Sequence, residues 1–347
     1  MITVCTRPTG PPSQAHLDPM RMRRRARQQG CYFATRQECK CQLNFMRLRY
    51  KLNDMNRDNS RTTVQPSLFE DDVILDVPES IGHANVKSVE ATAILTKASG
   101  FMGEYDYTLN PYSGCSFGCS YCYAAFFSRD AEKMRNWGYW VEVKENALEN
   151  LKKLRKKPLK EAKIYMSSVT DPYQTLERKL ELTRMILIEL EKYHEVRLTI
   201  QTRSPLVVRD IDILKKFKNI QVNITVTTDN EDIRKAFEPL CPSIGQRMRA
   251  ASELVDAQIP TSITMTPLLP IADPEHFVQR LLRTGVRKFV VQPFHPQRGK
   301  FVAGTRSTAL KAIQDLGWTE SGYERDLAIL MDGLPGLKEG REGFAPI

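Results

Sequence analysis

The sequence predicts an α/β fold, namely a partial (β/α)6 TIM-like barrel of parallel strands preceded by a poorly ordered basic N-terminal arm. From about residue 105 onward, short β-branched apolar runs alternate with stretches of helical periodicity, which is typical of strand–helix units around a parallel sheet. The pattern yields six units, fewer than the eight of a complete barrel. With 347 residues, the chain is long enough to bury a full core.

Residues 1–60 form the basic arm. They lack sustained apolar periodicity and hold twelve Lys or Arg residues against four Asp or Glu, so this segment carries +8 of the net charge of +10. Such a composition favours disorder, and basicity is also the usual electrostatic mark of nucleic-acid binding. Three interpretations stay open: a solvated tail, a chain that truly starts at Met46 or Met55, and an arm that binds nucleic acid.

Residues 61–104 are expected to approach and pack on the barrel, with turn signals at Pro66 and Pro78. The core then spans residues 105–347 and ends in helices. Strands are expected at residues 106–110, 162–168, 196–202, 221–227, 261–266 and 287–292. Helices are expected at residues 145–156, 176–193, 209–217, 243–257, 273–284, 304–315 and 319–332.

Two of these helices have distinct local signals. Across 176–193, leucine, isoleucine and tyrosine recur at roughly helical spacing. Asp273 is a helix-capping residue and is followed by Pro274, which suits the first helical position.

The loop after the first expected strand carries three cysteines, Cys115, Cys119 and Cys122, in the spacing C-x3-C-x2-C. They lie too close together for a disulfide framework but are well spaced to wrap one iron–sulfur cluster, and three thiolates leave one iron of a four-iron cluster open. Gly114 and Gly118 allow the tight turns that such wrapping needs. In parallel βα architectures the working face lies at the carboxyl ends of the strands, where this loop is expected.

Two alternatives to a cluster exist for these cysteines. Three cysteines with a fourth ligand could form a structural zinc site, but zinc sites usually pair C-x2-C with a second ligand pair, and none follows nearby. Three unligated core cysteines are a weaker alternative. Cys31, Cys39 and Cys41, within the arm, match no established metal spacing and are interpreted as bystanders.

Cysteine usage also bears on the compartment. The apolar runs are far too short to cross a bilayer, and the N-terminus shows no secretory pattern. Eight cysteines in such a chain favour reduced thiols or metal ligands over disulfides. A cytoplasmic protein without membrane association is therefore expected.

The run from Asn110 through Cys115 to Cys119, Cys122 and Ala124 resembles the radical S-adenosylmethionine (SAM) superfamily, in the branch related to spore photoproduct lyase. Supporting phrases are residues 167–173, 202–205 and 343–346, and the resemblance covers about residues 90–347. It implies a barrel of the radical SAM type with a [4Fe–4S] cluster on the three cysteines. It also implies that the cluster reductively cleaves SAM to a 5′-deoxyadenosyl radical, which abstracts hydrogen from a substrate. A flavodoxin or ferredoxin would donate the electron.

The resemblance also suggests SAM contacts at the strand ends. Family members often have a Gly-Gly-Glu run after the second strand, where this chain has Ser167-Ser168 and then Asp171; Ser168 and Asp171 are predicted to hold the SAM amine. Arg203 matches a lysine that the branch uses near the SAM carboxylate. Thr225 and Thr227 are predicted to face the ribose. An ordinary turn at Asp171, a surface ion pair at Arg203 and plain strand threonines are the alternatives.

The sequence departs from the lyase at its hydrogen-return step. The lyase uses an additional cysteine near its second strand, and residues 164–168 contain none. Cys241 is interpreted as structural. Tyr121 and Tyr123 match the lyase pattern, so a tyrosine relay is retained as their catalytic role.

The substrate and the oligomeric state are left open by the sequence. Nucleic acid, a small metabolite and a peptide are all open as substrates. A zinc-stabilised, non-catalytic nucleic-acid-binding protein is the alternative function, since it would use the basic arm.

Overall fold

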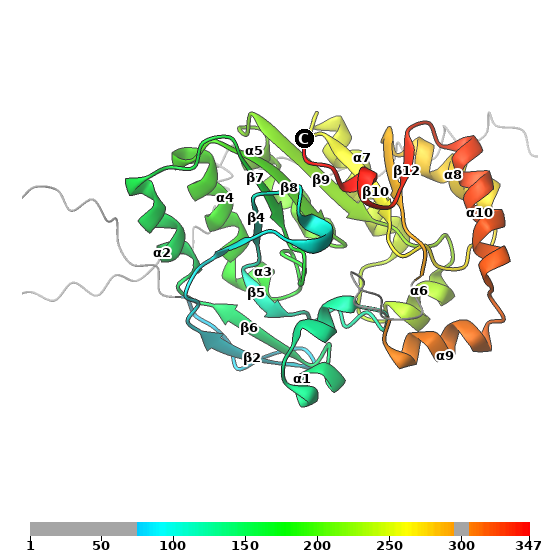
Figure 1. The fold of residues 1–347 in the computed structure, drawn as a ribbon, viewed down its shortest axis with the longest axis horizontal. Helices are drawn as coiled ribbons and strands as arrows, with labels where there is room; N and C mark the ends of the chain where they lie inside the picture. The colour runs from blue at the N-terminus through cyan, green and yellow to red at the C-terminus, as the bar shows by residue number, and fades with distance from the viewer. Residues whose placement is uncertain (1–74, 295–304) are drawn as a thin grey trace, which may run out of the picture. The chain divides into compact units, whose positions relative to one another are not determined.

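A computed structural model describes residues 75–294 and 305–347, all within one compact unit, Ser67–Ile347 (Figure 1). The predicted arm of residues 1–60, with its cysteines, lies outside the described residues.

A large sheet forms the centre of the described part of the chain. Its order is β12-β11-β10-β9-β8-β7-β4-β3. The strands are β3 (Leu95–Lys97), β4 (Tyr107–Leu109), β7 (Ala162–Met166), β8 (Val196–Thr202), β9 (Asn219–Thr225), β10 (Thr261–Met265), β11 (Lys288–Val291) and β12 (Leu337–Glu339). Neighbours from β4 to β12 pair in parallel, whereas β3 pairs with β4 antiparallel. All six predicted strands are present, so the partial (β/α)6 barrel is confirmed; β12 was not predicted.

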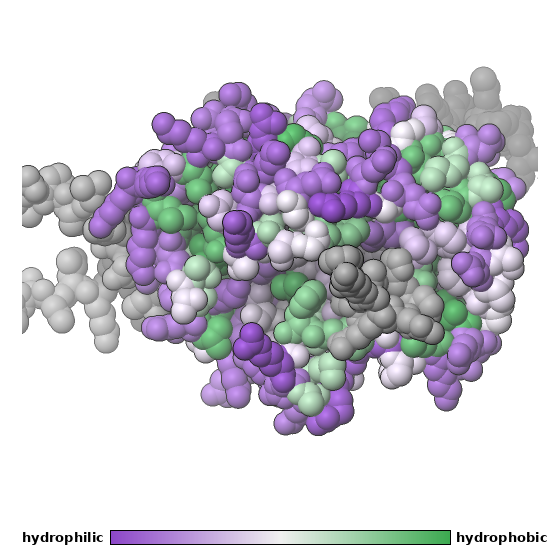
Figure 2. All heavy atoms as spheres, in the orientation of Figure 1, coloured by the Kyte–Doolittle hydropathy of each residue, from purple (hydrophilic) through white to green (hydrophobic). Residues whose placement is uncertain are grey.

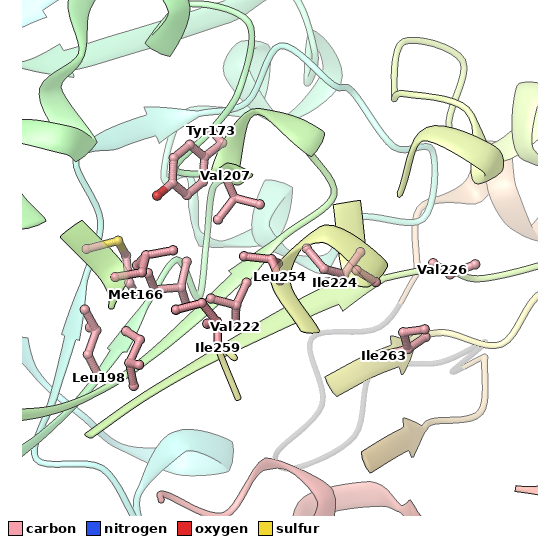
Figure 3. Packing of buried hydrophobic residues seen from close by; sticks show 14 of the residues in the cluster. Met166, Tyr173, Leu198, Val207, Val222, Ile224, Val226, Leu254, Ile259 and Ile263 are labelled. Atoms are coloured by element: carbon pink, nitrogen blue, oxygen red, sulfur yellow. The ribbon is translucent and has the colours of Figure 1, made fainter. Parts of the chain in front are cut away.

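Alternation along the central strands creates an apolar face and a polar face. Leu198, Val222 and Ile224 are buried against the helix side, where Leu254 and Ile259 also pack (Figure 3). The residues between them are polar and hydrogen-bond to one another across strands. Gln201 Nε2 donates to Thr264 Oγ1 at 2.8 Å, and Gln201 Oε1 accepts from Tyr165 at 2.9 Å. Because strand side chains alternate between faces, this polar row lies on the face opposite the helices.

The helices largely follow the predicted ranges. They are α1 (Ala131–Arg135), α2 (Ala147–Lys152), α3 (Glu177–Leu180), α4 (Leu182–Tyr193), α5 (Ile211–Leu214), α6 (Glu231–Phe237), α7 (Ile244–Asp256), α8 (Pro274–Arg283), α9 (Ser307–Asp315) and α10 (Glu320–Gly333). The single helix predicted over 176–193 is wrong, because Glu181 adopts a left-handed conformation (φ 51°) and separates α3 from α4. Asp273 caps α8 as expected, accepting a hydrogen bond from the His276 backbone N–H. The short helices α1 and α6 were not predicted.

A second, smaller sheet has the order β1-β2-β6-β5. It comprises β1 (Ser80–Ile81), β2 (Ala84–Val89), β5 (Tyr112–Gly114) and β6 (Trp140–Lys144). Strand β5 ends directly before Cys115 and pairs antiparallel with β6. At Gly114 (φ 73°), an added Cβ would lie 2.5 Å from the Trp140 carbonyl oxygen, so the start of the cysteine loop requires glycine. The small sheet thereby anchors one end of that loop.

The C-terminal segment packs on the polar face of the large sheet. Phe344 lies edge-on to Tyr165, with ring centroids 6.4 Å apart. Gly343 permits this approach, because a Cβ there would lie 2.3 Å from a methyl group of Val290. The phrase at residues 343–346 is thus explained by close packing.

The surface view in Figure 2 is mostly hydrophilic, with apolar residues scattered between charged ones. None of the helices in the described part of the chain combines the length and the apolarity that a bilayer crossing requires.

Candidate active site

Two consecutive tight turns shape the loop between β5 and the short 3-10 helix Tyr123–Phe127. The Gly118 N–H donates to the Cys115 carbonyl at 3.2 Å, and the Cys122 N–H donates to the Cys119 carbonyl at 3.1 Å. Gly118 has φ 56°, as this tight wrapping requires. The Cys115 and Cys119 side chains are buried and Cys122 is partly buried, and all three thiols are free. The loop therefore presents three thiols from a short, sheltered segment.

The thiols differ in their protonation. Burial raises the pKa of Cys115 well above the ordinary thiol value, and burial raises the pKa of Cys122 to about 11. The pKa of Cys119 is lowered by its hydrogen bond with Cys241, with Arg203 and Arg247 adding to the effect. A metal bound here would have to displace protons from Cys115 and Cys122, because the thiolate is the form that ligates a metal.

The three thiols fit the ligand set of an iron–sulfur cluster. Within residues 75–294 and 305–347, no three His, Cys, Asp or Glu side chains converge on a point where a single ion could bind. A structural zinc needs four donors around one centre. A cluster takes each thiolate at a separate iron, which a short loop with two turns can supply.

A turn formed by residues 237–241, which we call the support turn, holds the cysteine loop from the side. It begins at Phe237, the last residue of α6, and residues 119–121 of the cysteine loop contact it. The Ser120 N–H donates to the Phe237 carbonyl at 2.8 Å. Cys119 Sγ lies 3.5 Å from Cys241 Sγ, and the Tyr121 hydroxyl donates to Glu238. The conformation of the loop therefore depends on the support turn.

Glu238 is the charged centre of this contact. Its Oε1 accepts hydrogen bonds from Tyr121 and from Thr227 Oγ1 (3.0 Å), while its Oε2 pairs with Arg247 Nη2 at 2.5 Å. Burial opposes ionisation of this carboxyl, but Arg247 and Arg203 outweigh that effect and hold the pKa of Glu238 at about 2. Burial raises the pKa of Tyr121 well above its ordinary value. A neutral phenol therefore donates to an anionic carboxylate beside the cysteine loop.

Arg203 reaches this group from the end of β8. Its Nη2 donates to the Tyr121 oxygen at 3.0 Å, and its Nε lies 3.5 Å from Glu238 Oε1. The alternative of an ordinary surface ion pair does not apply, because its partner Glu238 is fully buried. Arg203, which is predicted to contact the SAM carboxylate, thus lies next to a tyrosine of the cysteine loop.

Asp171 links the ends of β7 and β8. Its Oδ1 accepts from Thr202 Oγ1 at 2.7 Å and from the Tyr173 N–H at 2.9 Å, and its Oδ2 accepts from the Arg203 N–H at 2.8 Å. Burial raises the pKa of Asp171 above its ordinary value. Asp171 therefore fixes the backbone from which the Arg203 side chain extends.

Ser168 and Tyr123 form a second contact at the carboxyl end of β7. The Tyr123 hydroxyl donates to the Ser168 carbonyl, and Ser168 Oγ accepts from Asn110 Nδ2 at 3.4 Å. The preceding residue, Ser167, has φ 76°, a conformation that favours glycine, and its buried hydroxyl has no partner among the described residues. Serine thus occupies a backbone conformation suited to the glycine of the related pattern.

The two predicted ribose contacts, Thr225 and Thr227, belong to different hydrogen-bonded groups. Thr227 belongs to the Glu238 group. Thr225 lies in the polar row of the large sheet, where its hydroxyl accepts from Gln201 at 2.5 Å. The structure therefore gathers Tyr121, Arg203 and Thr227 at one point and leaves Thr225 within the sheet network.

Sequence reasoning missed several residues of this site. Glu238 was not singled out, and Cys241 was interpreted as structural without its place beside Cys119. Gly138 was also missed: its φ is 107°, and an added Cβ would lie 2.8 Å from the Gly118 Cα, so it holds the cysteine loop closely. For Glu238 and Cys241, the available signal was the run Glu238-Pro239-Leu240-Cys241-Pro242. Its two prolines indicate a turn, and the turn carries a carboxylate and a thiol.

Two uncharacterized proteins have sequences similar to that of this chain. An uncharacterized protein of Methanocaldococcus jannaschii is 38% identical over 173 residues, covering 50% of this chain and 64% of that protein. An uncharacterized protein of Acidianus two-tailed virus is 25% identical over 237 residues, covering 64% of this chain and 75% of that protein. The chain thus spans less than two thirds of the archaeal relative.

Solved structures of spore photoproduct lyase share the fold. A cysteine variant aligns with a TM-score of 0.51 and 14% identity, covering 73% of this chain and 81% of that one. A double variant with bound AdoMet and dinucleoside spore photoproduct aligns with a TM-score of 0.51 and 13% identity, over the same shares of the two chains. The model of the radical SAM superfamily matches residues 109–282, which include the three cysteines, Asp171 and Arg203. The chain belongs to the radical SAM superfamily.

Proposed function

We propose that this radical SAM enzyme holds a [4Fe–4S] cluster on Cys115, Cys119 and Cys122 and binds SAM at the remaining iron. The observation that carries the proposal is the three-thiol loop, which follows β5 and lies beside Arg203 at the end of β8. When bound, the cluster and SAM supply hydrogen-atom abstraction after one-electron cleavage of SAM. The protein binds, orients and shields these groups.

Arg203 is proposed as the residue that grips the SAM carboxylate. A guanidinium carries five N–H donors, and the contacts with Tyr121 and Glu238 engage only two of its nitrogens. The paired arrangement of its donors matches a carboxylate. Tyr121, Glu238 and the Asp171–backbone contact orient the guanidinium before SAM arrives.

Ser168 is proposed to accept hydrogen bonds from the SAM amine, and Ser167 is added because its buried hydroxyl lacks a partner among the described residues. For Asp171 we favour a positioning role, because three protein donors already engage its carboxylate. Thr225 and Thr227 stay predicted ribose contacts, and both hydroxyls also bond to the protein. Tyr121 and Tyr123 stay candidates for a hydrogen relay.

Reconstitution with iron and sulfide under anaerobic conditions tests the assignment. We expect a brown protein with about four iron and four sulfide per chain, whose reduced-state EPR spectrum changes when SAM is added. The Cys115→Ala/Cys119→Ala/Cys122→Ala variant should remain colourless. A colourless wild-type protein that holds one zinc would instead support the zinc-stabilised, non-catalytic alternative.

We further propose nucleic acid as the substrate class to test first. Two observations support it: the charge of +8 in residues 1–60, and a neighbouring fold solved with a dinucleoside photoproduct. The missing second-strand cysteine argues against the same photoproduct repair. Oligonucleotide affinity of the full chain should fall steeply with salt, and part of the binding should persist without residues 1–60. Binding that disappears with the arm would favour a small metabolite or peptide as the substrate of the barrel.

The electron donor is proposed to be a flavodoxin or ferredoxin, since the chain offers one cysteine motif of the cluster type. A cytoplasmic location is proposed because the cysteines must stay reduced to bind iron. Reduction of the reconstituted cluster by a purified flavodoxin system, followed by its visible spectrum, tests the first proposal.

A further inference from the structure

Cys241 lies outside the cysteine motif but against one of its members. Its Sγ is 3.5 Å from Cys119 Sγ, and the next acceptor, the Phe117 carbonyl oxygen, is 4.0 Å away. Cys241 is buried, with 7% of the residue exposed. A buried thiol in contact with a ligand sulfur has two possible relationships to the cluster: a hydrogen-bond donor to that sulfur, or a further ligand.

The position of Cys241 is fixed by its backbone. Its N–H donates to the Glu238 carbonyl at 3.1 Å, and its own carbonyl accepts from Arg234 Nη1 at 3.1 Å. The same nitrogen of Arg234 donates to the Glu238 carbonyl at 2.9 Å, and Glu231 pairs with Arg234 at 2.6 Å. The thiol is therefore held by the support turn and needs no rearrangement to meet Cys119.

We propose that the Cys241 S–H donates a hydrogen bond to the sulfur of Cys119 when that sulfur ligates the cluster, and that this hydrogen bond raises the cluster's reduction potential. The inference rests on the proposed cluster. A ligating thiolate is a better acceptor than the neutral carbonyl of Phe117, because it carries negative charge. Hydrogen bonds to cluster sulfurs stabilise the more negative, reduced state, so they favour acceptance of the electron.

Donation also keeps the site open for SAM. If Cys241 were a fourth ligand, no iron would remain free in a four-iron cluster. As a donor to Cys119, Cys241 leaves the three-cysteine set intact. It is a positioning residue that acts through Cys119.

The test compares the full-length, reconstituted wild type with Cys241→Ala, Cys241→Val and Cys241→Ser. Valine fills the site without a donor, whereas serine keeps a hydroxyl donor. The readouts are iron content, the EPR response to SAM, and the potential from an EPR-monitored redox titration without SAM.

We expect full iron content and an EPR response to SAM in every variant. At a fixed solution potential, the ratio of reduced to oxidised cluster should fall about tenfold in the alanine and valine variants, which is about 59 mV for a one-electron couple. The serine variant should recover part of this ratio. Circular dichroism melts establish which variants are folded, and the serine variant alone decides the outcome if both apolar variants fail.

Two results would overturn the inference. Unchanged potentials in the folded alanine and valine variants would show that the contact does not tune the cluster. Loss of iron from the alanine and valine variants, with a wild type that gives no EPR response to SAM, would make Cys241 a ligand. If the wild type itself binds no cluster, it is the proposed function that fails, and this is distinguishable because that result precedes any comparison of variants.

Discussion

The guanidinium of Arg203 lies 3.0 Å from the phenol oxygen of Tyr121, which joins the end of β8 to the cysteine loop. Both side chains also reach the buried carboxylate of Glu238. The Glu238 carboxylate therefore holds Arg203, the proposed SAM-binding residue, in a fixed position relative to Tyr121 of the cysteine loop. The stability of this group and the binding of SAM are expected to be coupled.

Replacing Arg203 tests its proposed grip on SAM. Arg203→Lys keeps a positive charge but loses the paired donor geometry, so we expect SAM affinity to fall about tenfold or more. Equilibrium binding of SAM to reconstituted protein measures the effect, with iron content as the control for an intact cluster. Wild-type affinity in a variant with full iron content would remove Arg203 from the SAM site.

Glu238 is expected to be a major determinant of stability. Glu238→Gln leaves Arg247, which is fully buried, without a charged partner, and breaking such a pair costs about 3–5 kcal/mol. Urea unfolding measures the loss. Asp232→Ala is the matched control on α6, because the Asp232–Lys235 pair is exposed and should contribute less than about 1 kcal/mol. Equal effects from the two substitutions would contradict the assigned role.

The stabilisation from Glu238 should depend on pH. The pKa of Glu238 is lowered from 4.5 to about 2 in the folded protein, so its contribution is present above the unfolded value and is lost as pH falls toward the folded one. The difference in free energy of unfolding between wild type and Glu238→Gln should therefore shrink between about pH 5 and pH 2. A difference that stays constant over this range would show that the carboxyl is not ionised as described.

Gly118 is expected to be required for the cysteine loop. Alanine there must adopt φ 56° and place its Cβ 3.0 Å from the Gly138 Cα. Gly82 provides the control, because it has φ 58° with no atom within 4 Å of an added Cβ. Both substitutions incur backbone strain of about 1–2 kcal/mol, but only Gly118→Ala should also reduce iron content after reconstitution. Similar iron contents would mean that the close approach of the loop to Gly138 is dispensable.

The sequence predicts the barrel well because each central strand is a buried, β-branched run flanked by helical periodicity. Cys115, Cys119 and Cys122 were found because their spacing is local. Glu238 and Cys241 were not placed because their partners Tyr121 and Cys119 lie 117 and 122 residues away along the chain. The break at Glu181 was missed because the apolar periodicity continues across it, and α6 was missed because it is short and mostly polar.

The most direct test of the central claim is the formation of 5′-deoxyadenosine. Reconstituted protein, reduced with dithionite and incubated anaerobically with SAM, should yield 5′-deoxyadenosine by liquid chromatography. The triple cysteine variant should yield none. Absence of 5′-deoxyadenosine from a wild type that carries a full, reduced cluster would contradict the account.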